Sequence, residues 1–494
     1  MRFILIRCEN TYLGWNMIKQ IHLFIILIFF CCFNTKITAQ KVVVSPELNM
    51  RNDFAYYIIP GAEDHTHVVR DKAYRLTIQT LTPKNEWTPE TSIELKSKKW
   101  KIMEIYPSGS NISIFYQTLV DDYLILFHSI YKPNGEWVSD DTVHYKKANQ
   151  IHSALRIKTS ISQDWICFGY LGQNKKHYLT LYQRSSQRTL FDTCLTDMLK
   201  YEDNSVEEIE LNDHGQITLI GEIEVNKFIK KRVIYRLSFI SSEGALVAEK
   251  DIEFEDQWPL DIKMKNHPEK NHLFISGLYA EKNSSTPVGF YILDWDYANN
   301  SIEKKYSEIS EALFKEWTGK ERKKSYANNL LTQHLIFTDS NRVLVFYESN
   351  KELSRKPYFS SVSDGPLNIS RWTDYYYEDI LAIQFDEDQE ISWEKVLHKK
   401  QFSQDDDGLF SSFFIFSTSD FLRIIFNDEI KSESTVSEYI LLPNGEFIRK
   451  SVLNTTQKNL FLRFRDAIQI NSNSLIVPSE VNGKMNLVKI TFDN

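Results

Sequence analysis

A strand–turn–strand pattern recurs along this chain and limits it to a repeat architecture. Tyr74–Trp87 reads as an alternating apolar strand, a Pro-Lys-Asn turn and a Glu-Trp pair, and Tyr123–Trp137 repeats that order with its tryptophan fifty residues later. Alternation is typical of a strand with one buried face, and turn residues between two such runs predict a hairpin. Copies at a fixed spacing predict repeated supersecondary units.

Weaker copies of this unit continue towards the C-terminus, at Tyr178–Tyr182, Val233–Phe254, Phe290–Tyr306, Ile380–Leu397, Tyr439–Leu453 and Leu487–Phe492. A second pair of strands precedes most of them, which makes four strands in a unit of fifty to sixty residues. Such a unit is one β-propeller blade, and a blade buries its two faces only by stacking on neighbours until the ring closes. The sequence therefore predicts an all-β protein, folded as a β-propeller.

The count of inner strands favours eight blades of four strands. Seven blades are the alternative, because residues 54–71 are short for two strands of the first blade. A pair of β-sandwiches is a further alternative, although the even spacing argues for radial repetition. The last repeat stops at Phe492 after three strands, so Val42–Val44 is expected to add the outer strand and pair the two chain ends. Residues 40–494 are then one propeller domain.

Glycine and cysteine recur inside the strands. Gly169, Gly221 and Gly277 end similar runs, and crowding near the propeller axis is the predicted reason for a residue without a side chain. Cys167 and Cys194 fall on two strands of one blade with a third strand between them. That separation is roughly 9–10 Å, and a disulfide requires Cα atoms within about 7 Å. Two free thiols are expected.

The first 39 residues have the features of a secretory signal peptide. Leu23–Phe33 is an apolar run of eleven residues, too short to span a bilayer, and it follows Lys19. Cleavage after Ala39 leaves Gln40 as the new N-terminus, and Met17 is an alternative start. A lipid anchor on Cys31 or Cys32 is the competing interpretation. Export is expected, to the periplasm, the cell surface or the medium, with no transmembrane segment in the mature chain.

Charge narrows the classes of partner. Residues 1–39 hold four basic residues and one acidic residue, so the remainder carries 54 basic and 65 acidic residues, a net charge of −11. The negatively charged backbone of a nucleic acid binds proteins of positive net charge, so nucleic acid is not expected as a partner.

The departures from the plain repeat fall in the fifth to seventh repeats. Residues 307–325 contain Ile309, Leu313 and Trp317 at helical spacing, with Ser307 as the expected N-cap and Gly319 as the end of the helix. This is the one helical insertion that the sequence predicts. It lies in a blade-to-blade connection, which leaves a propeller on the same face as the loops between second and third strands.

Residues 349–378 are expected to form a long loop between the second and third strands of the sixth blade. Long loops on a rigid scaffold often carry binding residues, and tyrosine and tryptophan suit sugars or peptides. Tyr375–Tyr377 also fit alternating strand positions, which is the interpretation favoured for those three residues. The predicted ligand-binding residues are Tyr358, Phe359, Trp372, Tyr376 and Trp317.

An acidic run, Asp405–Asp407, follows the sixth repeat. A Ca²⁺ site using Asp405 and Asp407 is one interpretation, although the run lacks the spaced oxygens of an EF-hand. A solvated acidic turn is the other. The sequence contains no nucleophile elbow, no phosphate-binding glycine loop and no Cys-x-x-Cys pair. No catalytic residue can be named.

The C-terminal hundred residues resemble a group of exported Bacteroidota β-propeller proteins of unassigned activity. The matching residues are Asp406-Asp407-Gly408 with Ser411-Ser412, Ile424–Asp428, Leu442–Glu446 and the closing run Ile468–Phe492. The resemblance implies a fold and no activity. The sequence favours a non-enzymatic binding or scaffolding propeller, with a protein, peptide or glycan held at the loops of blades five to seven. The alternative is a hydrolase or lyase acting on glycans, with carboxylates in the central funnel.

Overall fold

Eight separate antiparallel sheets make up the fold of this protein, seen in a computed structural model. The structure describes residues 40–72, 75–152, 156–173, 175–199, 201–223, 234–254, 256–282, 284–319, 329–338, 342–355, 372–428, 435–455 and 459–493. In seven sheets the four principal strands lie side by side in chain order, which is the arrangement of a propeller blade. The prediction of eight blades is confirmed. Seven blades and paired sandwiches are both wrong, because residues 54–71 do hold two strands.

The strands of the first four blades, from the inner to the outer strand, are β3 (Ala55–Pro60), β4 (Thr66–Asp71), β5 (Leu76–Leu81) and β6 (Thr91–Ile93); β7 (Trp100–Ser108), β8 (Asn111–Val120), β9 (Tyr123–Tyr131) and β10 (Trp137–Lys147); β11 (Arg156–Thr159), β12 (Trp165–Leu171), β13 (His177–Gln183) and β14 (Arg188–Cys194); and β15 (Tyr201–Leu211), β16 (Ile217–Ile223), β17 (Ile234–Ile240) and β18 (Leu246–Glu253).

Blades 5 to 8 follow the same order, with three short strands in addition. In blade 5 two short strands, β19 and β20, both pair with β21 in place of a single inner strand; β28 is added to blade 6 and β2 to blade 8. The strands are β19 (Gln257–Pro259), β20 (Lys263–Asn266), β21 (His272–Glu281), β22 (Pro287–Asp296) and β23 (Ser301–Glu308); β24 (Leu330–Phe337), β25 (Val343–Arg355), β26 (Trp372–Phe385), β27 (Ile391–Leu397) and β28 (Gln401–Gln404); β29 (Phe414–Ser417), β30 (Leu422–Asn427), β31 (Thr435–Leu441) and β32 (Phe447–Asn454); and β33 (Ile468–Asn471), β34 (Ser474–Val481), β35 (Lys484–Thr491), β1 (Lys41–Val44) and β2 (Leu48–Asn49).

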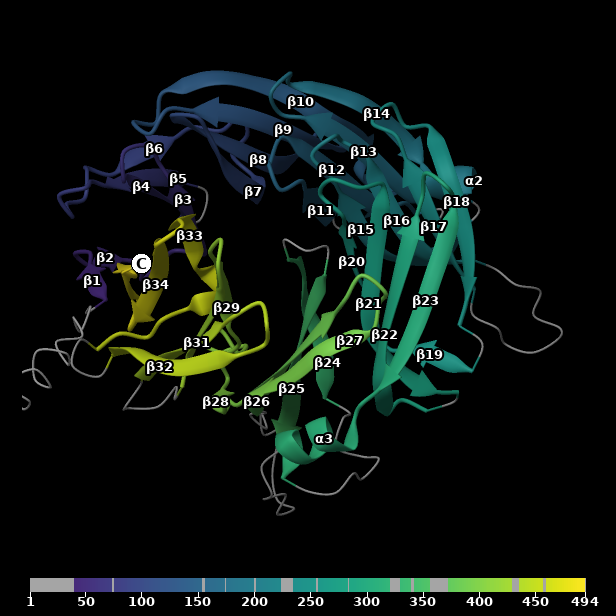
Figure 1. Cartoon of the computed structure of the whole chain (residues 1–494). Coiled ribbons are helices and arrows are strands. Elements are labelled where there is room, and N and C mark those ends of the chain that lie inside the picture. The colour runs from purple at the N-terminus through teal and green to yellow at the C-terminus, as the bar shows by residue number, and fades with distance from the viewer. Residues whose placement is uncertain are drawn as a thin grey trace, which may run out of the picture.

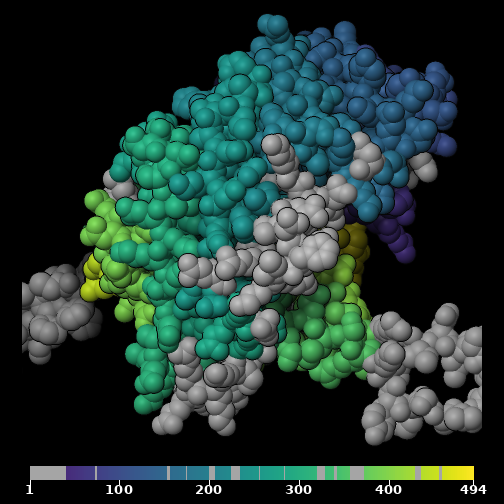
Figure 2. All heavy atoms as spheres, turned by 90° about the vertical axis from the view of Figure 1, so that its right-hand side faces the viewer, coloured from purple at the N-terminus to yellow at the C-terminus, as the bar shows by residue number. Residues whose placement is uncertain are grey.

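The two ends of the chain meet in the eighth blade. β1 pairs antiparallel with β35, with Val42 opposite Ile490 and Val44 opposite Val488, as predicted. Figure 1 shows the purple N-terminal strands beside the yellow C-terminal ones, with the other blades following one another around the ring. In the space-filling view of Figure 2 the colour passes from blue through teal to green, because consecutive blades are neighbours in space.

The apolar core is divided among the seams between blades. Each of eight buried clusters joins two neighbouring blades, including blade 8 with blade 1. Leu179 of blade 3 and Leu219 of blade 4, for example, share one cluster and are fully buried. Because both faces of many strands are buried in these seams, the sequences of those strands are nearly continuous apolar runs. The ring is therefore held together by lateral packing between sheets.

The two faces of the ring differ in the length of their connections. On one face, which we call the short-turn face, every connection except 82–90 spans at most five residues. The opposite face carries the joins between second and third strands and the joins between blades, and we call it the long-connection face. The strands on either side of 224–233, 309–329, 356–371, 398–413 and 455–467 end at this face. The helices α2 (Leu195–Leu199) and α3 (Glu311–Thr318), and the 3-10 turns η1 (Ala148–Gln150) and η3 (Phe464–Asp466), also lie in its connections.

The predicted helix forms, but its N-cap is a different serine. Ser310 Oγ accepts a hydrogen bond from the amide of Leu313 at 3.0 Å, and Gly319 ends the helix in the left-handed conformation as expected. The prediction of Ser307 as the cap is wrong, because Ser307 pairs with Phe290 in the last strand of blade 5. The sequence also missed α2, a helix of five residues between blades 3 and 4.

The expected loop 349–378 is largely strand. β25 continues to Arg355 and β26 begins at Trp372, so the connection is 356–371, outside the described residues. The strand interpretation of Tyr375–Tyr377 is confirmed, because these residues pair with both β25 and β28. The segment forms strands and not a loop because residues 350–355 pair with residues 372–377, which pair in turn with β28.

The predictions for cysteine and glycine fare differently. Cys167 on β12 and Cys194 on β14 are free thiols with β13 between them, as predicted. Crowding explains Gly277, where a Cβ would lie 2.1 Å from the carbonyl oxygen of Asp261. It does not explain Gly169, where the nearest atom to an added Cβ is 3.7 Å away, an ordinary contact.

Candidate functional site

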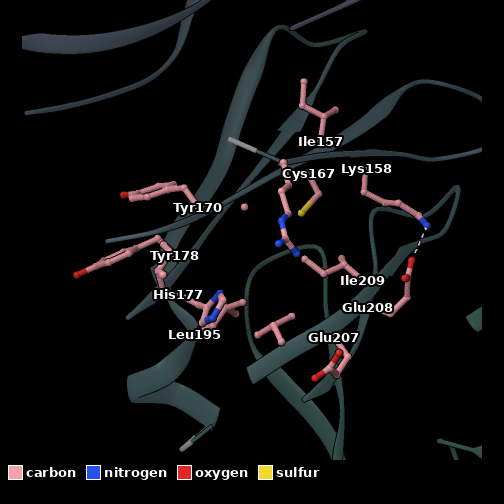
Figure 3. Close-up of a pocket in the computed structure, with 14 residues that line it drawn as sticks. Ile157, Lys158, Cys167, Tyr170, His177, Tyr178, Leu195, Glu207, Glu208 and Ile209 are labelled. Atoms are coloured by element: carbon pink, nitrogen blue, oxygen red, sulfur yellow. Dashed lines mark hydrogen bonds and ion pairs between the residues drawn. The ribbon is translucent and has the colours of Figure 1, made fainter. Parts of the chain in front are cut away.

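A cavity of about 210 Å³ lies at the seam between blades 3 and 4, towards the long-connection face. Its walls come from five elements: the inner strand of each blade (β11 and β15), the second and third strands of blade 3 (β12 and β13), and α2. Figure 3 shows Cys167 and Ile209 in the middle of the close-up, Tyr170 and Tyr178 on one side, and Lys158 with Glu208 on the other. We call this space the seam cavity.

A break in strand register gives the seam cavity its acidic side. Val206 pairs with Gly221 and Glu208 pairs with Ile220, so Glu207 is an extra residue in β15. In a regular strand successive side chains point to opposite faces, whereas a β-bulge redirects them locally. Consequently the four consecutive residues Val206–Ile209 all line the cavity. Bulges are frequent next to functional sites for this reason.

One acid and one base at the seam cavity have no partner among the residues that the structure describes. Neither Glu207 nor Arg156 forms an ion pair or a side-chain hydrogen bond with any described residue. Burial raises the pKa of the Glu207 carboxyl, and the positive charge of Arg156 partly opposes that rise. Both side chains line the cavity and are exposed to solvent, so each can contact a group of opposite charge that enters it.

The other charges at the seam cavity are paired with each other. Lys158 Nζ lies 3.4 Å from Glu208 Oε1 and 2.9 Å from Glu210 Oε2, and Lys265 approaches Glu210 at 3.6 Å. Burial lowers the pKa of Lys158, but the two glutamates outweigh it and leave the pKa raised. These side chains link the inner strands of blades 3, 4 and 5 and hold the seam in place.

Apart from His177, the remaining lining is apolar and aromatic. Cys167 and Leu195 are almost fully buried, and Ile209 contacts the place where Gly169 lacks a side chain. Tyr170 and Tyr178 face each other across β12 and β13, with ring centroids 5.1 Å apart and planes within 8°. Gly169 therefore keeps the wall open without any steric need of its own. The seam cavity combines an apolar interior with one free charge of each sign.

Cys167 is chemically inert in this setting. Its side chain is 1% exposed, and burial raises the pKa of the thiol well above its ordinary value, with a small opposing contribution from Lys158. A thiolate is the nucleophilic form of cysteine. Cys167 acts as part of the apolar wall.

Of the residues predicted from sequence, Trp317, Trp372 and Tyr376 lie elsewhere on the long-connection face, at blades 5 and 6. Trp372 is half-buried on β26, opposite Arg355. The ring of Tyr376 contacts Phe402 of β28 at 5.1 Å, and its hydroxyl accepts a hydrogen bond from Arg355 at 3.1 Å. Both aromatic residues thus belong to the extended β25–β26 hairpin.

Trp317 does not join that pair. Trp317 of α3 packs against the apolar cluster between blades 5 and 6 and meets Phe314 edge to face at 6.0 Å. Tyr358 and Phe359 lie outside the described residues. The structure therefore brings Trp372 and Tyr376 together on one strand and assigns Trp317 to a helix–sheet contact.

The aspartate run continues from β28. Asp405 Oδ1 accepts from the amide of Thr373 at 2.8 Å, and Asp407 Oδ1 accepts from the hydroxyl of Tyr375 at 3.0 Å, which raises the pKa of that phenol. In the described part of the chain, no group of three or more His, Cys, Asp or Glu side chains is placed to hold a metal ion. Calcium binding at Asp405 and Asp407 stays a prediction. No helix in the described ranges is long and apolar enough to cross a membrane.

Sequence reasoning missed the seam cavity because its residues occupy ordinary strand positions. Arg156, Cys167 and Glu207 are separated in the chain and meet only where two blades pack. The one available signal was the Gly169 position, which was attributed to crowding. An unexplained glycine in a strand also marks a place where a ligand approaches closely.

Comparisons with known proteins give structural likeness only. No protein-family model matches the chain, and no curated protein matches it. The WD40 domain of SCAP from fission yeast is 10% identical with a TM-score of 0.41, covering 92% of this chain and 98% of that one. The β-propeller domain of the Trilobed protease from Pyrococcus furiosus is 9% identical with a TM-score of 0.37, covering 80% and 94%. A europium-containing methanol dehydrogenase is 8% identical with a TM-score of 0.43, covering 91% and 93%. These values are too low to bear on function, and the order of strands in the eight sheets defines this chain as an eight-bladed β-propeller.

Proposed function

We propose that this protein is an exported, non-enzymatic binding propeller that holds its ligand or partner on the long-connection face. The observation that carries the proposal is the contrast between the two faces. The short-turn face has almost nothing but tight turns, whereas α2, α3, the added strand β28 and the strand ends that the long connections join lie at the other face. Connections longer than folding requires, on a rigid scaffold, are where binding usually evolves.

Two parts of that face support binding. The seam cavity offers a concave site with an unpaired acid and base. The β25–β26 hairpin offers Trp372 and Tyr376 to a protein, peptide or glycan, with Asp405 and Asp407 beside it for calcium. Export remains part of the proposal, and N-terminal sequencing of the secreted protein is expected to begin at Gln40.

The face can be tested with a matched pair of variants on blade 3. Gln173 lies in the β12–β13 turn of the long-connection face, and Ser186 lies in the β13–β14 turn of the short-turn face. In a Cys194→Ser background, Gln173→Cys and Ser186→Cys are each coupled to a polyethylene-glycol maleimide, while buried Cys167 stays unmodified. Both proteins are then applied to glycan and peptide arrays.

We expect the wild type and the Ser186 conjugate to give the same pattern of bound ligands, and the Gln173 conjugate to lose it. Equal loss in both conjugates, or in neither, would place the binding surface away from the long-connection face. An array on which the wild type binds nothing would contradict the proposed function.

The second candidate function is a glycan-active hydrolase or lyase. It is favoured by Glu207, whose raised pKa on an inner strand is the property that a general acid needs. A second carboxylate is also required, and Glu208 is engaged by Lys158. A reducing-sugar assay on polysaccharides decides between the two. Activity that Glu207→Gln abolishes would replace the binding function by the enzymatic one.

A further inference from the structure

We infer that the seam cavity between blades 3 and 4 binds a free α-amino acid with an apolar side chain. The inference rests on the proposed function and names its ligand at one site. Arg156 and Glu207 supply one unpaired charge of each sign at the cavity, and the interior between them is apolar. An α-amino acid carries a carboxylate, an ammonium and a side chain on one carbon, which is the same combination in a small volume.

The two free charges fit the two ends of a zwitterion. A guanidinium presents a planar fork that matches a carboxylate with two parallel hydrogen bonds, so Arg156 is the group for the ligand carboxylate. Glu207 is the group for the ammonium. The two side chains are close enough for the charge of Arg156 to act on Glu207, yet they form no ion pair with each other. A ligand that bridges both of them satisfies both.

The surrounding charges do not favour an ion of a single sign. Lys158 is neutralised by Glu208 and Glu210, and Glu210 is shared with Lys265. A multiply charged anion would therefore be repelled by the glutamates, and a multiply charged cation by Arg156 and Lys158. A ligand with one charge of each sign meets neither penalty.

The interior and its size select the rest of the ligand. Cys167, Leu195 and Ile209 form an apolar lining, and the stacked pair Tyr170 and Tyr178 adds a flat aromatic wall. The volume of about 210 Å³ lies below the range of roughly 300–1,000 Å³ that is usual for drug-sized ligands. A molecule of amino-acid size fits, whereas a long oligosaccharide or a folded peptide does not enter.

Isothermal titration calorimetry of the purified wild-type protein tests this inference with L-leucine as the probe. N-acetyl-L-leucine lacks the ammonium, L-leucinamide lacks the carboxylate, and glycine lacks the apolar side chain. We expect L-leucine to bind and each of the other three to bind about tenfold more weakly or worse, which corresponds to losing one charge-assisted contact or the apolar contact.

Two variants assign the charges. Glu207→Gln is expected to bind L-leucine and N-acetyl-L-leucine with similar affinity, because the ammonium is no longer recognised. Arg156→Gln is expected to bind L-leucine and L-leucinamide with similar affinity. Glu249→Gln on β18 and Arg188→Gln on β14 remove the same charges from the outer strands and serve as controls with wild-type selectivity.

Three results would overturn the inference. They are no heat of binding with L-leucine, unchanged selectivity in both Glu207→Gln and Arg156→Gln, and equally tight binding of the dipeptide Leu-Leu, which would mean a site for a peptide end. If L-leucine does not bind but the arrays still report ligands that only the Gln173 conjugate loses, this inference fails while the proposed function stands.

Discussion

His67 and His128 are buried in this propeller and hydrogen-bond to uncharged hydroxyl groups. His128 is fully buried, with Ser113 Oγ at 2.5 Å from Nε2 and Tyr182 Oη at 2.7 Å from Nδ1, and the ring of Phe115 stacks on it at 4.4 Å. Burial lowers the pKa of His128 to about 3, and burial likewise lowers the pKa of His67 to about 4. Between the folded pKa and the ordinary value of about 6.5, these imidazoles are therefore neutral in the folded state and protonated in the unfolded state.

Acid is expected to destabilise the protein through these histidines. A group with a lowered folded pKa takes up protons on unfolding, so stability is lost as the pH falls below about 6.5 towards the folded value. Each such histidine is expected to cost about 2 kcal/mol of unfolding free energy between pH 7 and pH 5. Urea unfolding of wild type and His128→Gln at both pH values measures this. Glutamine keeps hydrogen-bonding groups but does not titrate, so an undiminished pH dependence in His128→Gln would contradict the assignment.

At the scale of elements, the β25–β26 hairpin extends beyond the body of blade 6. Its outer part is held by polar contacts, including an ion pair of 2.5 Å between Arg355 Nε and Asp374 Oδ2, and by pairing with β28. Trp372 stands opposite Arg355 and belongs to none of the clusters between blades. The extension can therefore vary without disturbing the seams.

Trp372→Ala is expected to leave the fold nearly intact, with a loss of at most about 1 kcal/mol in unfolding free energy. Trp295→Ala is the matched control, because Trp295 is fully buried between blades 4 and 5 and its truncation is expected to cost about 3–5 kcal/mol. Denaturant unfolding compares the two. If both variants lose similar stability, Trp372 is a core residue, and the case for it as a binding residue ends.

At the scale of the whole molecule, the ring is closed by four residues from the start of the described chain. β1 supplies the outer strand of blade 8, Val42 and Val44 pack against the cluster between blades 7 and 8, and Ser45 hydrogen-bonds with Leu487. Since each blade is stabilised by its neighbours, an opening at one place weakens two seams at once.

Deleting Lys41–Ser45 is expected to lower the melting temperature by about 5 °C or more and to promote aggregation, because β35 is left with an unpaired edge. Differential scanning calorimetry and light scattering measure both effects. Deletion of the final Asp493 and Asn494, which follow β35, is the control. A deletion of Lys41–Ser45 that melts like this control would mean that the β1–β35 pairing contributes nothing to closure.

The sequence by itself determined the features that depend on short stretches of chain. Alternation and turn residues predicted the hairpins, their spacing predicted eight blades, and the truncated last repeat predicted the pairing of the ends. The helix around Leu313 and its end at Gly319 were also predictable, since periodicity and a left-handed glycine are local signals. The N-cap was predicted at Ser307 and lies at Ser310, because either serine fits the sequence pattern of a cap. Only the pairing of Ser307 with Phe290 in blade 5 excludes it.

Only the tertiary structure decided which residues meet. The seam cavity forms where β11 and β12 of one blade pack beside β15 of the next, and its acidic side depends on a one-residue bulge at Glu207 that leaves no mark in the residue pattern. Arg156 and Glu207 are fifty-one positions apart, and whether they pair or stay apart is set by the packing of two sheets. Strand patterns report which side of a sheet a residue occupies, but the space between two sheets is fixed only when both are in place.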